Sequence, residues 1–245
     1  MDDQSPGLSA GLCVASIHPA DVILDHFPSL IEFVPACYKR WSNYARRMPD
    51  IISFHPVQSI WISGLLFALI HSVLASRVCK TGWHSMGISP RAYRLVYVGI
   101  GLFTTALWLG FVALLPDRAL YAVDWPWRAG MHALQALGLW IVLASLAPID
   151  VPAFLGLRPF PDSLEPFVER GIYKRLRHPM YTGIMLMMFA SPLQSLDSLN
   201  LFLAIAAYFI VGSKFEERRM LATHPEYAVY RTRVPAFVPR LTGNR

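Results

Sequence analysis

Three long apolar runs constrain this chain more than any other feature. They cover Val57 to Ala75, Leu95 to Leu115 and Ala129 to Ala147, and none contains Lys, Arg, Asp or Glu. At about 1.5 Å of rise per residue, a helix of about 20 residues crosses the roughly 30 Å hydrocarbon core of a bilayer. Hydrophobic residues make up 54% of the chain and charged residues 16%, so much of the folded surface is expected to face lipid. We predict three transmembrane helices in these runs.

Two further apolar runs, Met180 to Pro192 and Leu199 to Gly212, are separated only by a short polar stretch. Each is shorter than the roughly 17 residues that a simple span requires. They form either a helical hairpin or two full spans. In the second case the ends of the spans include flanking polar residues, and Arg177 and Lys214 extend toward the headgroups. The prediction is an all-α, polytopic membrane helix bundle with about five transmembrane helices, of which the last two form the possible hairpin.

Basic residues are distributed unevenly along this topology. If consecutive spans alternate in direction, residues 76–94, 148–178 and 214–245 share one side of the membrane. That side carries 16 of the 22 Lys and Arg, and the other side carries 6. Because basic loops stay in the cytoplasm, we predict a cytoplasmic carboxy terminus. The charges suit membrane lipids as partners and are too dispersed for a nucleic-acid site. No feature of the sequence indicates the oligomeric state.

The amino-terminal segment differs from the rest, because prolines and acidic residues interrupt its apolar residues and it lacks the basic start of a secretory signal. We expect residues 1–56 to be a peripheral or interfacial extension and residues 57–245 to form one membrane domain. The cysteines Cys13, Cys37 and Cys79 have an odd count and no metal-binding spacing. They predict neither a disulfide framework nor a zinc site.

A polar motif, Arg177-His178-Pro179-Met180-Tyr181-Thr182-Gly183, lies between a basic loop and an apolar run. Pro179 fits the first turn of a helix, which places His178 near the N-cap. The start of such a helix offers free N–H groups and a positive dipole end, and Arg177 adds a fixed charge. Together they suit a carboxylate or a phosphate. Gly183 would let another backbone or a flat ligand approach.

Two carboxylates, Glu216 and Glu217, follow the last apolar run. Ionisable groups at membrane depth usually have partners. The alternative for the two glutamates is a pair of solvated interfacial charges that form ion pairs with the arginines that follow. The alternative for the His-Pro pair is that it only caps a helix at the membrane interface. Tyr227 and Tyr230, further along the tail, are expected to anchor in the headgroup region.

The last third of the chain resembles the isoprenylcysteine carboxyl methyltransferase and phospholipid methyltransferase superfamily. The resemblance rests on the succession Gly171-x-Tyr173-x-x-x-Arg177-His178-Pro179-x-Tyr181-x-Gly183, then Glu216-Glu217-x-x-x-Leu221, then Tyr227-x-x-Tyr230-x-x-x-Val234-Pro235. The first half adds a similarity to bacterial methanethiol S-methyltransferases and to nitric oxide reductase accessory-type membrane proteins. This similarity is carried by His71 to Ser76, Tyr93 to Tyr97 and Phe154 to Arg158.

The resemblance implies an integral membrane enzyme, in a bacterial inner membrane, that binds S-adenosylmethionine at the cytoplasmic face and admits its acceptor from the bilayer. Arg177, His178 and the helix start would hold the cofactor's carboxylate. Glu216 or Glu217 would bind its ammonium or ribose, and Tyr181 would lie near its sulfonium. The expected cofactor-binding residues are Tyr173, Arg177, His178, Pro179, Tyr181, Gly183, Glu216 and Glu217. The candidate catalytic residues are Arg177, His178 and Tyr181, and no metal is expected.

Methyl transfer to a small or lipophilic thiol is the expected reaction. A thiol with a pKa of about 8.5 needs a positive field or a base, for which Arg177 and His178 are candidates. Carboxyl methylation of a prenylated cysteine is an alternative that the residues leave open. Two others are a haem-binding isomerase, with His71, His132 or His178 as axial ligands, and a noncatalytic accessory membrane protein. The paired glutamates argue against the haem protein.

Overall fold

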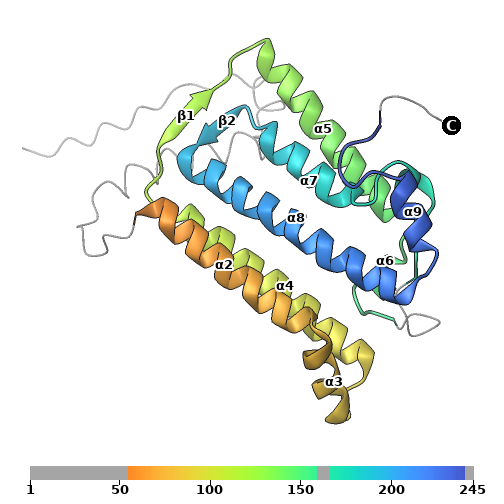
Figure 1. The fold of residues 1–245 in the computed structure, drawn as a ribbon. Helices are drawn as coiled ribbons and strands as arrows, with labels where there is room; N and C mark the ends of the chain where they lie inside the picture. The colour runs from red at the N-terminus through yellow and green to blue at the C-terminus, as the bar shows by residue number, and fades with distance from the viewer. Residues whose placement is uncertain (1–54, 159–165, 241–245) are drawn as a thin grey trace, which may run out of the picture. The chain divides into compact units, whose positions relative to one another are not determined.

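The computed structural model describes residues 55–158 and 166–240. The expected amino-terminal extension lies outside these residues except for its last two positions, as do Cys13 and Cys37. Four helices in the described part are long and apolar enough to cross a membrane. They are α2 (Pro56–Ala75), α4 (Pro90–Ala113), α5 (Trp127–Leu146) and α8 (Leu196–Thr223) (Figure 1). The predicted all-α membrane bundle is confirmed, and its first three spans are α2, α4 and α5.

The sequence sets where these helices begin. Ser89 caps α4 by accepting a hydrogen bond from the Ala92 N–H, and Pro90 occupies the first turn, where its missing N–H costs nothing. At the start of α8, the side chains of Ser195 and Ser198 each accept a hydrogen bond from the other residue's backbone N–H. This reciprocal capping satisfies two of the donors that a helix start leaves free.

Most of the surface of each span faces outward. Only between 11% and 22% of the most apolar window of each span is buried inside the protein. Leu65 of α2 and Leu102 of α4 are 73% and 69% exposed. Apolar side chains on such a surface are expected to contact lipid tails. The buried remainder forms a core between α2, α4 and α8 around Ile60, Trp108 and Ala204.

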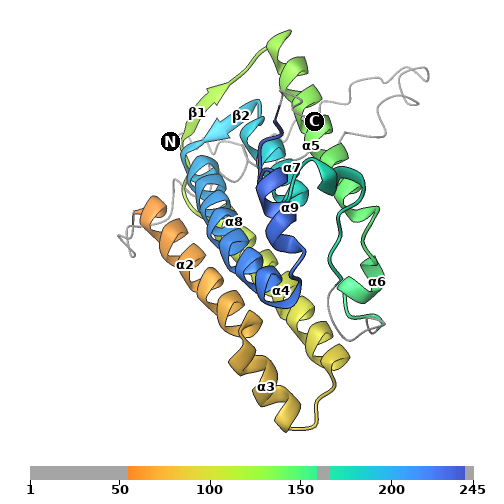
Figure 2. The ribbon, with the colours of Figure 1, turned by 45° about the vertical axis from the view of Figure 1, so that its right-hand side comes forward.

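The fifth predicted span is a shorter helix. α7 (Pro179–Phe189) has 11 residues, about 16 Å of helix, whereas α8 has 28. The two run antiparallel and are joined through β2 (Leu193–Ser195) (Figures 1 and 2). The hairpin alternative therefore describes this part of the chain, with one arm too short to span a bilayer alone.

α7 packs closely along α5 because two glycines face each other. A Cβ on Gly183 would lie 2.6 Å from the Gly138 carbonyl oxygen, and a Cβ on Gly138 would lie 2.7 Å from the Gly183 carbonyl oxygen. Small residues permit this backbone approach between membrane helices. Gly183 thus serves the contact with another backbone, one of the two uses predicted for it.

A short antiparallel ribbon, which the sequence did not indicate, closes one end of the bundle. β1 (Ala119–Ala122) pairs with β2, with Ala119 opposite Ser195 and Ala122 opposite Leu193. The ribbon joins the link between α4 and α5 to the turn between α7 and α8. It therefore ties both halves of the chain together at that end.

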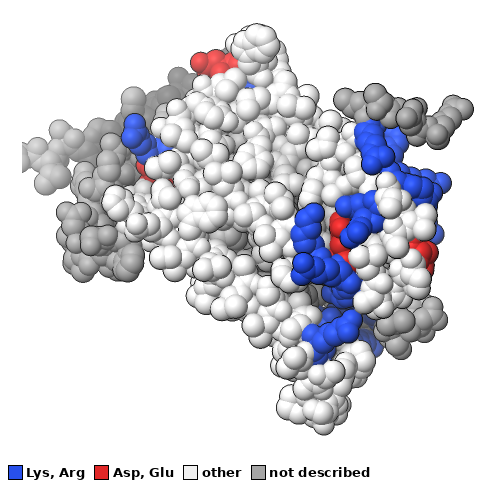
Figure 3. Space-filling model, in the orientation of Figure 1, with Lys and Arg blue, Asp and Glu red and all other residues white. Residues whose placement is uncertain are grey.

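The opposite end of the bundle carries the basic residues. It holds the short elements α3 (Arg77–Ser85), α6 (Val151–Phe154), η1 (Gly171–Lys174) and α9 (Tyr227–Arg233). Figure 3 shows Lys and Arg gathered there, on the right of the view. Within the two described ranges, only Arg118 and Arg128 lie at the other end. Alternating spans thus bring together the three basic segments, as the sequence predicts.

Candidate active site

The start of α7 is held by the tail that follows α9. His178 is the N-cap residue and Pro179 occupies the first turn. The backbone N–H groups of Arg177 and His178 donate to the carbonyls of Pro235 and Ala236, at 2.9 and 3.0 Å. The Thr182 hydroxyl donates to the Phe237 carbonyl at 2.9 Å. These bonds fix the direction in which the His178 side chain leaves the backbone.

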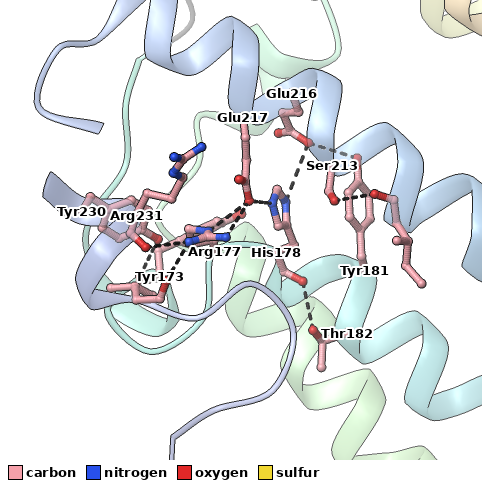
Figure 4. A network of polar contacts seen from close by, with 12 residues as sticks. Tyr173, Arg177, His178, Tyr181, Thr182, Ser213, Glu216, Glu217, Tyr230 and Arg231 are labelled. Atoms are coloured by element: carbon pink, nitrogen blue, oxygen red, sulfur yellow. Dashed lines mark hydrogen bonds and ion pairs between the residues drawn. The ribbon is translucent and has the colours of Figure 1, made fainter. Parts of the chain in front are cut away.

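A buried ion-pair network joins α7 to α8 (Figure 4). Oε1 of Glu217 accepts a hydrogen bond from Nε of Arg177 at 3.0 Å, forms an ion pair with Nη2 of Arg177 at 2.9 Å, and lies 3.0 Å from Nε2 of His178. The side chains of Arg177 and Glu217 are only 11% and 5% exposed. Both charges are therefore neutralised inside the protein, as burial demands. The alternative of a solvated glutamate is wrong for Glu217.

Most of the Arg177 donors are used inside the protein. Besides the hydrogen bond from Nε to Glu217, its Nη1 donates to the carbonyls of Arg231 and Val234, at 2.7 and 3.0 Å. A guanidinium has five N–H donors, and three are used in this way, while Nη2 makes the ion-pair contact with Glu217. Arg177 therefore fastens the end of α9 to α8 and to the start of α7.

Glu216, the preceding residue, faces different surroundings. Its side chain is 40% exposed, and Oε2 lies 3.8 Å from Nδ1 of His178. The same oxygen accepts a hydrogen bond from the Tyr181 hydroxyl at 3.2 Å. The Tyr181 ring lies parallel to the His178 ring, with centroids 5.6 Å apart, and stacks on Phe209 at 4.5 Å. Glu216 and Tyr181 thus form a polar edge beside the buried network.

A cavity of about 540 Å³ opens beside this edge. Its wall is built from the segment around α6, residues 166–173, the start of α7, and parts of α8 and α9. Three carboxylates contribute to the wall: Asp150, Glu169 and Glu216. The aromatic rings of Phe154, Phe167 and Tyr227 also line the wall. The volume is within the range of small-molecule sites, about 300–1,000 Å³.

Tyr227 and Tyr230 pack inward under this cavity, so the expectation that they are headgroup anchors is wrong. They are 5% and 2% exposed, in a cluster with Val234 against which Phe167 packs. The Tyr230 hydroxyl donates to the Tyr173 carbonyl at 2.7 Å. Burial raises the pKa of both tyrosines. Burial, with the negative charge of Glu216, also raises the pKa of Tyr173 to about 12. All three phenols are therefore neutral at physiological pH.

The structure gathers most of the predicted site residues around one cavity. Those on its wall are Tyr173, Arg177, His178, Pro179, Tyr181 and Glu216. Glu217 lies behind the wall and acts through Arg177 and His178, whereas Gly183 packs against α5.

Sequence reasoning missed Asp150, Glu169 and Arg170 on the wall, although the last two directly precede the Gly171 motif. It also missed Phe237, whose ring stacks 5.4 Å from His178. No local sequence pattern predicts the contact between Phe237 and His178.

The histidines considered as haem ligands have partners within the protein. Nε2 of His71 lies 3.0 Å from the Thr104 hydroxyl, and Nδ1 of His132 lies 2.9 Å from Oε1 of Gln135. His178 belongs to the Glu217 network. Across residues 55–158 and 166–240, His, Cys, Asp and Glu do not gather in a group of three or more that could hold a metal ion.

Comparisons with known proteins agree with the geometry. Residues 128–226 match the family described as phospholipid methyltransferase. The chain is 31% identical over 202 residues to methanethiol S-methyltransferase 2 of Bradyrhizobium diazoefficiens, which covers 74% of this chain and 72% of the relative. It is 28% identical over 197 residues to a methanethiol S-methyltransferase of Crocosphaera subtropica, over 71% of each chain.

A nurim homologue of Drosophila pseudoobscura is 24% identical over 177 residues, covering 65% of this chain and 67% of the relative. No solved structure matches at a significant level. The match to the Bradyrhizobium protein extends over most of both chains and is joined by a family match around the cavity. The chain therefore belongs to the family of membrane methyltransferases that includes the bacterial methanethiol S-methyltransferases.

Proposed function

We propose that the protein transfers a methyl group from S-adenosylmethionine to a small thiol at the cytoplasmic face of a bacterial inner membrane. The observation that carries this proposal is the 540 Å³ cavity beside Tyr181 and Glu216, held in place by the buried Arg177–Glu217–His178 network. The cavity lies at the basic end of the bundle, and the tendency of Lys and Arg to stay on the cytoplasmic side supports a cytoplasmic location for that end.

The chemistry of the cavity wall fits S-adenosylmethionine. Glu216 offers a partner for its ammonium group or ribose diol, whereas the two other wall carboxylates, Asp150 and Glu169, pair with Arg158 and Arg233. Aromatic rings suit the adenine. We assign the carboxylate of the cofactor to His178, the first N–H groups of α7 and Arg170, because Nε and Nη1 of Arg177 donate inside the protein and its Nη2 pairs with Glu217. The sulfonium would lie beside Tyr181, which is on the cavity wall.

When bound, S-adenosylmethionine would supply an electrophilic methyl group, and the rest of the cofactor would leave as a neutral sulfide. The protein supplies alignment of the acceptor and removal of water from it. Glu216 holds the Tyr181 hydroxyl, which fixes the ring at the cavity edge. Glu217 holds the His178 ring through Nε2, which leaves Nδ1 toward Glu216. Neither function requires a metal.

A small thiol is preferred as acceptor because two of the relatives reported above are named for methanethiol. Carboxyl methylation of a prenylated cysteine is the competing reaction, and the two differ in their dependence on pH. A thiol has to lose a proton with a pKa of about 8.5, whereas a carboxyl group is already ionised at neutral pH. The rate should therefore rise between about pH 6 and 8.5 for the thiol and stay flat for the carboxylate.

The test is product formation by the purified protein in lipid nanodiscs. We expect dimethyl sulfide, measured by gas chromatography, when methanethiol and S-adenosylmethionine are supplied. Glu216→Gln should lower kcat/KM by about 100-fold. Asp124→Asn, at the opposite end of the bundle where Asp124 is 95% exposed, is the matched control and should keep full activity. Methylation of a prenylcysteine without methylation of methanethiol would reject the thiol assignment, and no methylation of either would reject the proposed function.

A further inference from the structure

The segment that follows α9 lies along the start of α7 and is bonded to it at four consecutive residues. We call residues 234–237 the tail segment. Its first three carbonyls accept hydrogen bonds from Arg177 and His178, at 2.9 to 3.0 Å, and its fourth accepts one from the Thr182 hydroxyl at 2.9 Å. Each carbonyl of the tail segment is therefore held, which fixes its position against α7.

The last residue of the tail segment, Phe237, places its ring against the His178 imidazole. The two centroids lie 5.4 Å apart with an angle of 29° between the ring planes. Tyr181 also stacks on the imidazole, at 5.6 Å and 9°. Because the rings of Phe237 and Tyr181 make no contact with each other, they contact the imidazole at two separate places.

The His178 ring needs such contacts because its hydrogen bond with Glu217 fixes only one atom. That bond holds Nε2 at 3.0 Å (Figure 4). The side-chain torsion about the Cβ–Cγ bond of a histidine is broad, so the ring can still tilt about this bond. Tilting moves Nδ1, which lies 3.8 Å from Oε2 of Glu216. Rings packed against the imidazole oppose this motion, and Phe237 supplies one of them.

Phe237 itself does not lie on the cavity wall, whereas His178 and Tyr181 do. A molecule in the cavity would therefore be affected by Phe237 through the imidazole. The His178 side chain is only 5% exposed, so the ring has little room except where its neighbours allow it. Sites of this kind depend on packing by surrounding residues to hold a binding group in its productive geometry.

We propose that Phe237 is a positioning residue, which acts through His178 to hold the amino acid end of S-adenosylmethionine. That end carries a carboxylate and an ammonium group. Depending on its protonation, Nδ1 can donate to the first or accept from the second. In both cases the bond weakens steeply when its direction is wrong. The inference rests on the proposed methyltransferase function.

Phe237→Leu is the informative substitution, because leucine keeps an apolar side chain but has no flat face. Calorimetry of the protein in nanodiscs should show an affinity for S-adenosylmethionine about five- to tenfold weaker than that of the wild type, the worth of one hydrogen bond. The affinity for 5′-methylthioadenosine should stay at the wild-type value, because this molecule keeps the adenosine and lacks the amino acid end. General damage to the cavity would weaken both ligands.

A double-mutant cycle tests whether Phe237 acts through His178. His178→Ala should weaken S-adenosylmethionine binding by itself, and adding Phe237→Leu to it should cost nothing further. Independent contributions would instead add. Phe237→Tyr keeps the flat face and should retain the wild-type affinity, which a requirement for an aromatic ring predicts.

Two more variants complete the comparison. Phe103→Leu makes the same change in α4, where the ring is 68% exposed on the outer surface, and should bind as the wild type does. Thr182→Val removes the hydroxyl that donates to the Phe237 carbonyl and keeps the ring. It should give a smaller loss, again confined to S-adenosylmethionine and absent beside His178→Ala. This variant tests the inference even if Phe237→Leu does not fold.

Nuclear magnetic resonance of protein with ¹³C-labelled histidine rings gives a readout that needs no ligand. The His178 signal is identified by its loss in His178→Ala. We expect one sharp signal in the wild type and in Phe103→Leu, and a shifted or broadened signal in Phe237→Leu, where the ring tilts.

The inference is overturned if Phe237→Leu and Thr182→Val bind S-adenosylmethionine normally, weaken both ligands equally, or lose as much affinity beside His178→Ala as alone. An unchanged His178 signal in Phe237→Leu would also overturn it. These results leave the proposed function intact as long as the wild type binds S-adenosylmethionine, whereas a folded wild type that does not bind it overturns the function itself.

Discussion

Glu216 and Glu217 are neighbours in the sequence with different surroundings. Successive residues of a helix point about 100° apart, so one carboxylate reaches the cavity wall while the other turns into the protein. A single oxygen of Glu217 contacts three nitrogens, two of Arg177 and one of His178. We therefore assign Glu216 to the cofactor and Glu217 to the framework that aims His178.

Removing Glu217 should damage folding, whereas changing Glu216 should damage only binding. Glu217→Ala leaves the Arg177 guanidinium buried without a counter-charge, which costs about 3–5 kcal/mol. We expect a clear fall in Tm in detergent for Glu217→Ala and a Tm near the wild-type value for Glu216→Gln. The double variant Arg177→Met with Glu217→Leu should recover part of the lost stability. Equal melting of all four proteins would show that the buried pair does not support the fold.

The buried tyrosines should make the site sensitive to alkali. The folded pKa of Tyr173, about 12, lies above its ordinary value of 10.0. Its contribution to stability is therefore complete below about pH 10 and is lost as the pH rises through 12. Burial shifts Tyr227 and Tyr230 in the same direction. Circular dichroism against pH should show unfolding in this window, with a higher midpoint for Tyr173→Phe. Unchanged structure to pH 12 would contradict this prediction.

The sequence predicts that these polar residues lie close together, but it does not predict how each of them is oriented. The motif around His178 and the paired glutamates indicate a polar site at the edge of the membrane, because ionisable side chains are rare there. Which glutamate faces the cavity depends on the rotation of α8 against α7. That rotation is fixed by contacts far apart in the chain, such as Phe209 on Tyr181. The burial of Tyr227 likewise depends on Phe167, which no local pattern reveals.

Among the elements, α7 depends most on close packing. Its contact with α5 brings the carbonyls of Gly138 and Gly183 within 3 Å of where the opposing Cβ atoms would stand. Because His178 caps the start of α7, a shift of this helix would move the site directly. The glycine pair thus links helix packing to the position of the imidazole.

Alanine at either glycine should therefore separate α5 from α7. We expect Gly138→Ala and Gly183→Ala each to destabilise the protein by about 1–3 kcal/mol and to weaken binding of S-adenosylmethionine. Gly110→Ala in α4 is the matched control, because a Cβ there meets nothing within 4 Å. It should be neutral or slightly stabilising. The Tm of each of the three variants measures the change in stability. Equal Tm values would mean that α5 and α7 can move apart without loss of stability.

The spans could be predicted from the sequence because length and composition decide them. The short strands could not, because β1 (Ala119–Ala122) shows no alternation of buried and exposed residues. It exists through its pairing with β2. The short apolar run in the sequence indicates that α7 is a short helix. The choice between a hairpin and two full spans depends on the end of α7 at Ala190 and on the pairing of the ribbon that follows, which the sequence does not show.

For the whole described domain, the two ends differ in charge and in chemistry. One end carries the ribbon, and the other carries the cavity with most of the described Lys and Arg (Figure 3). Under the proposed function, the charged cofactor would reach the cavity from the aqueous side and a lipophilic acceptor would reach it from the bilayer. Such a division suits an enzyme whose two substrates come from different phases.

The orientation of the domain can be tested by labelling. We expect a cysteine introduced at Arg233, which is 60% exposed at the basic end, to react with a membrane-impermeant maleimide only in inverted membrane vesicles. A cysteine at Asp124, 95% exposed at the other end, should react only in intact spheroplasts. A variant with Cys13, Cys37 and Cys79 all replaced by Ser serves as the background for both. The reverse pattern would place the cavity outside the cytoplasm, away from the supply of S-adenosylmethionine.

The most direct test of the account is calorimetric titration of the wild-type protein in nanodiscs with S-adenosylmethionine. We predict one binding site in the wild type, an affinity at least about tenfold weaker in Glu216→Gln, and wild-type affinity in Asp124→Asn. Absence of binding to the folded wild type, or unchanged binding in Glu216→Gln, would contradict the assignment of this cavity to the methyl donor.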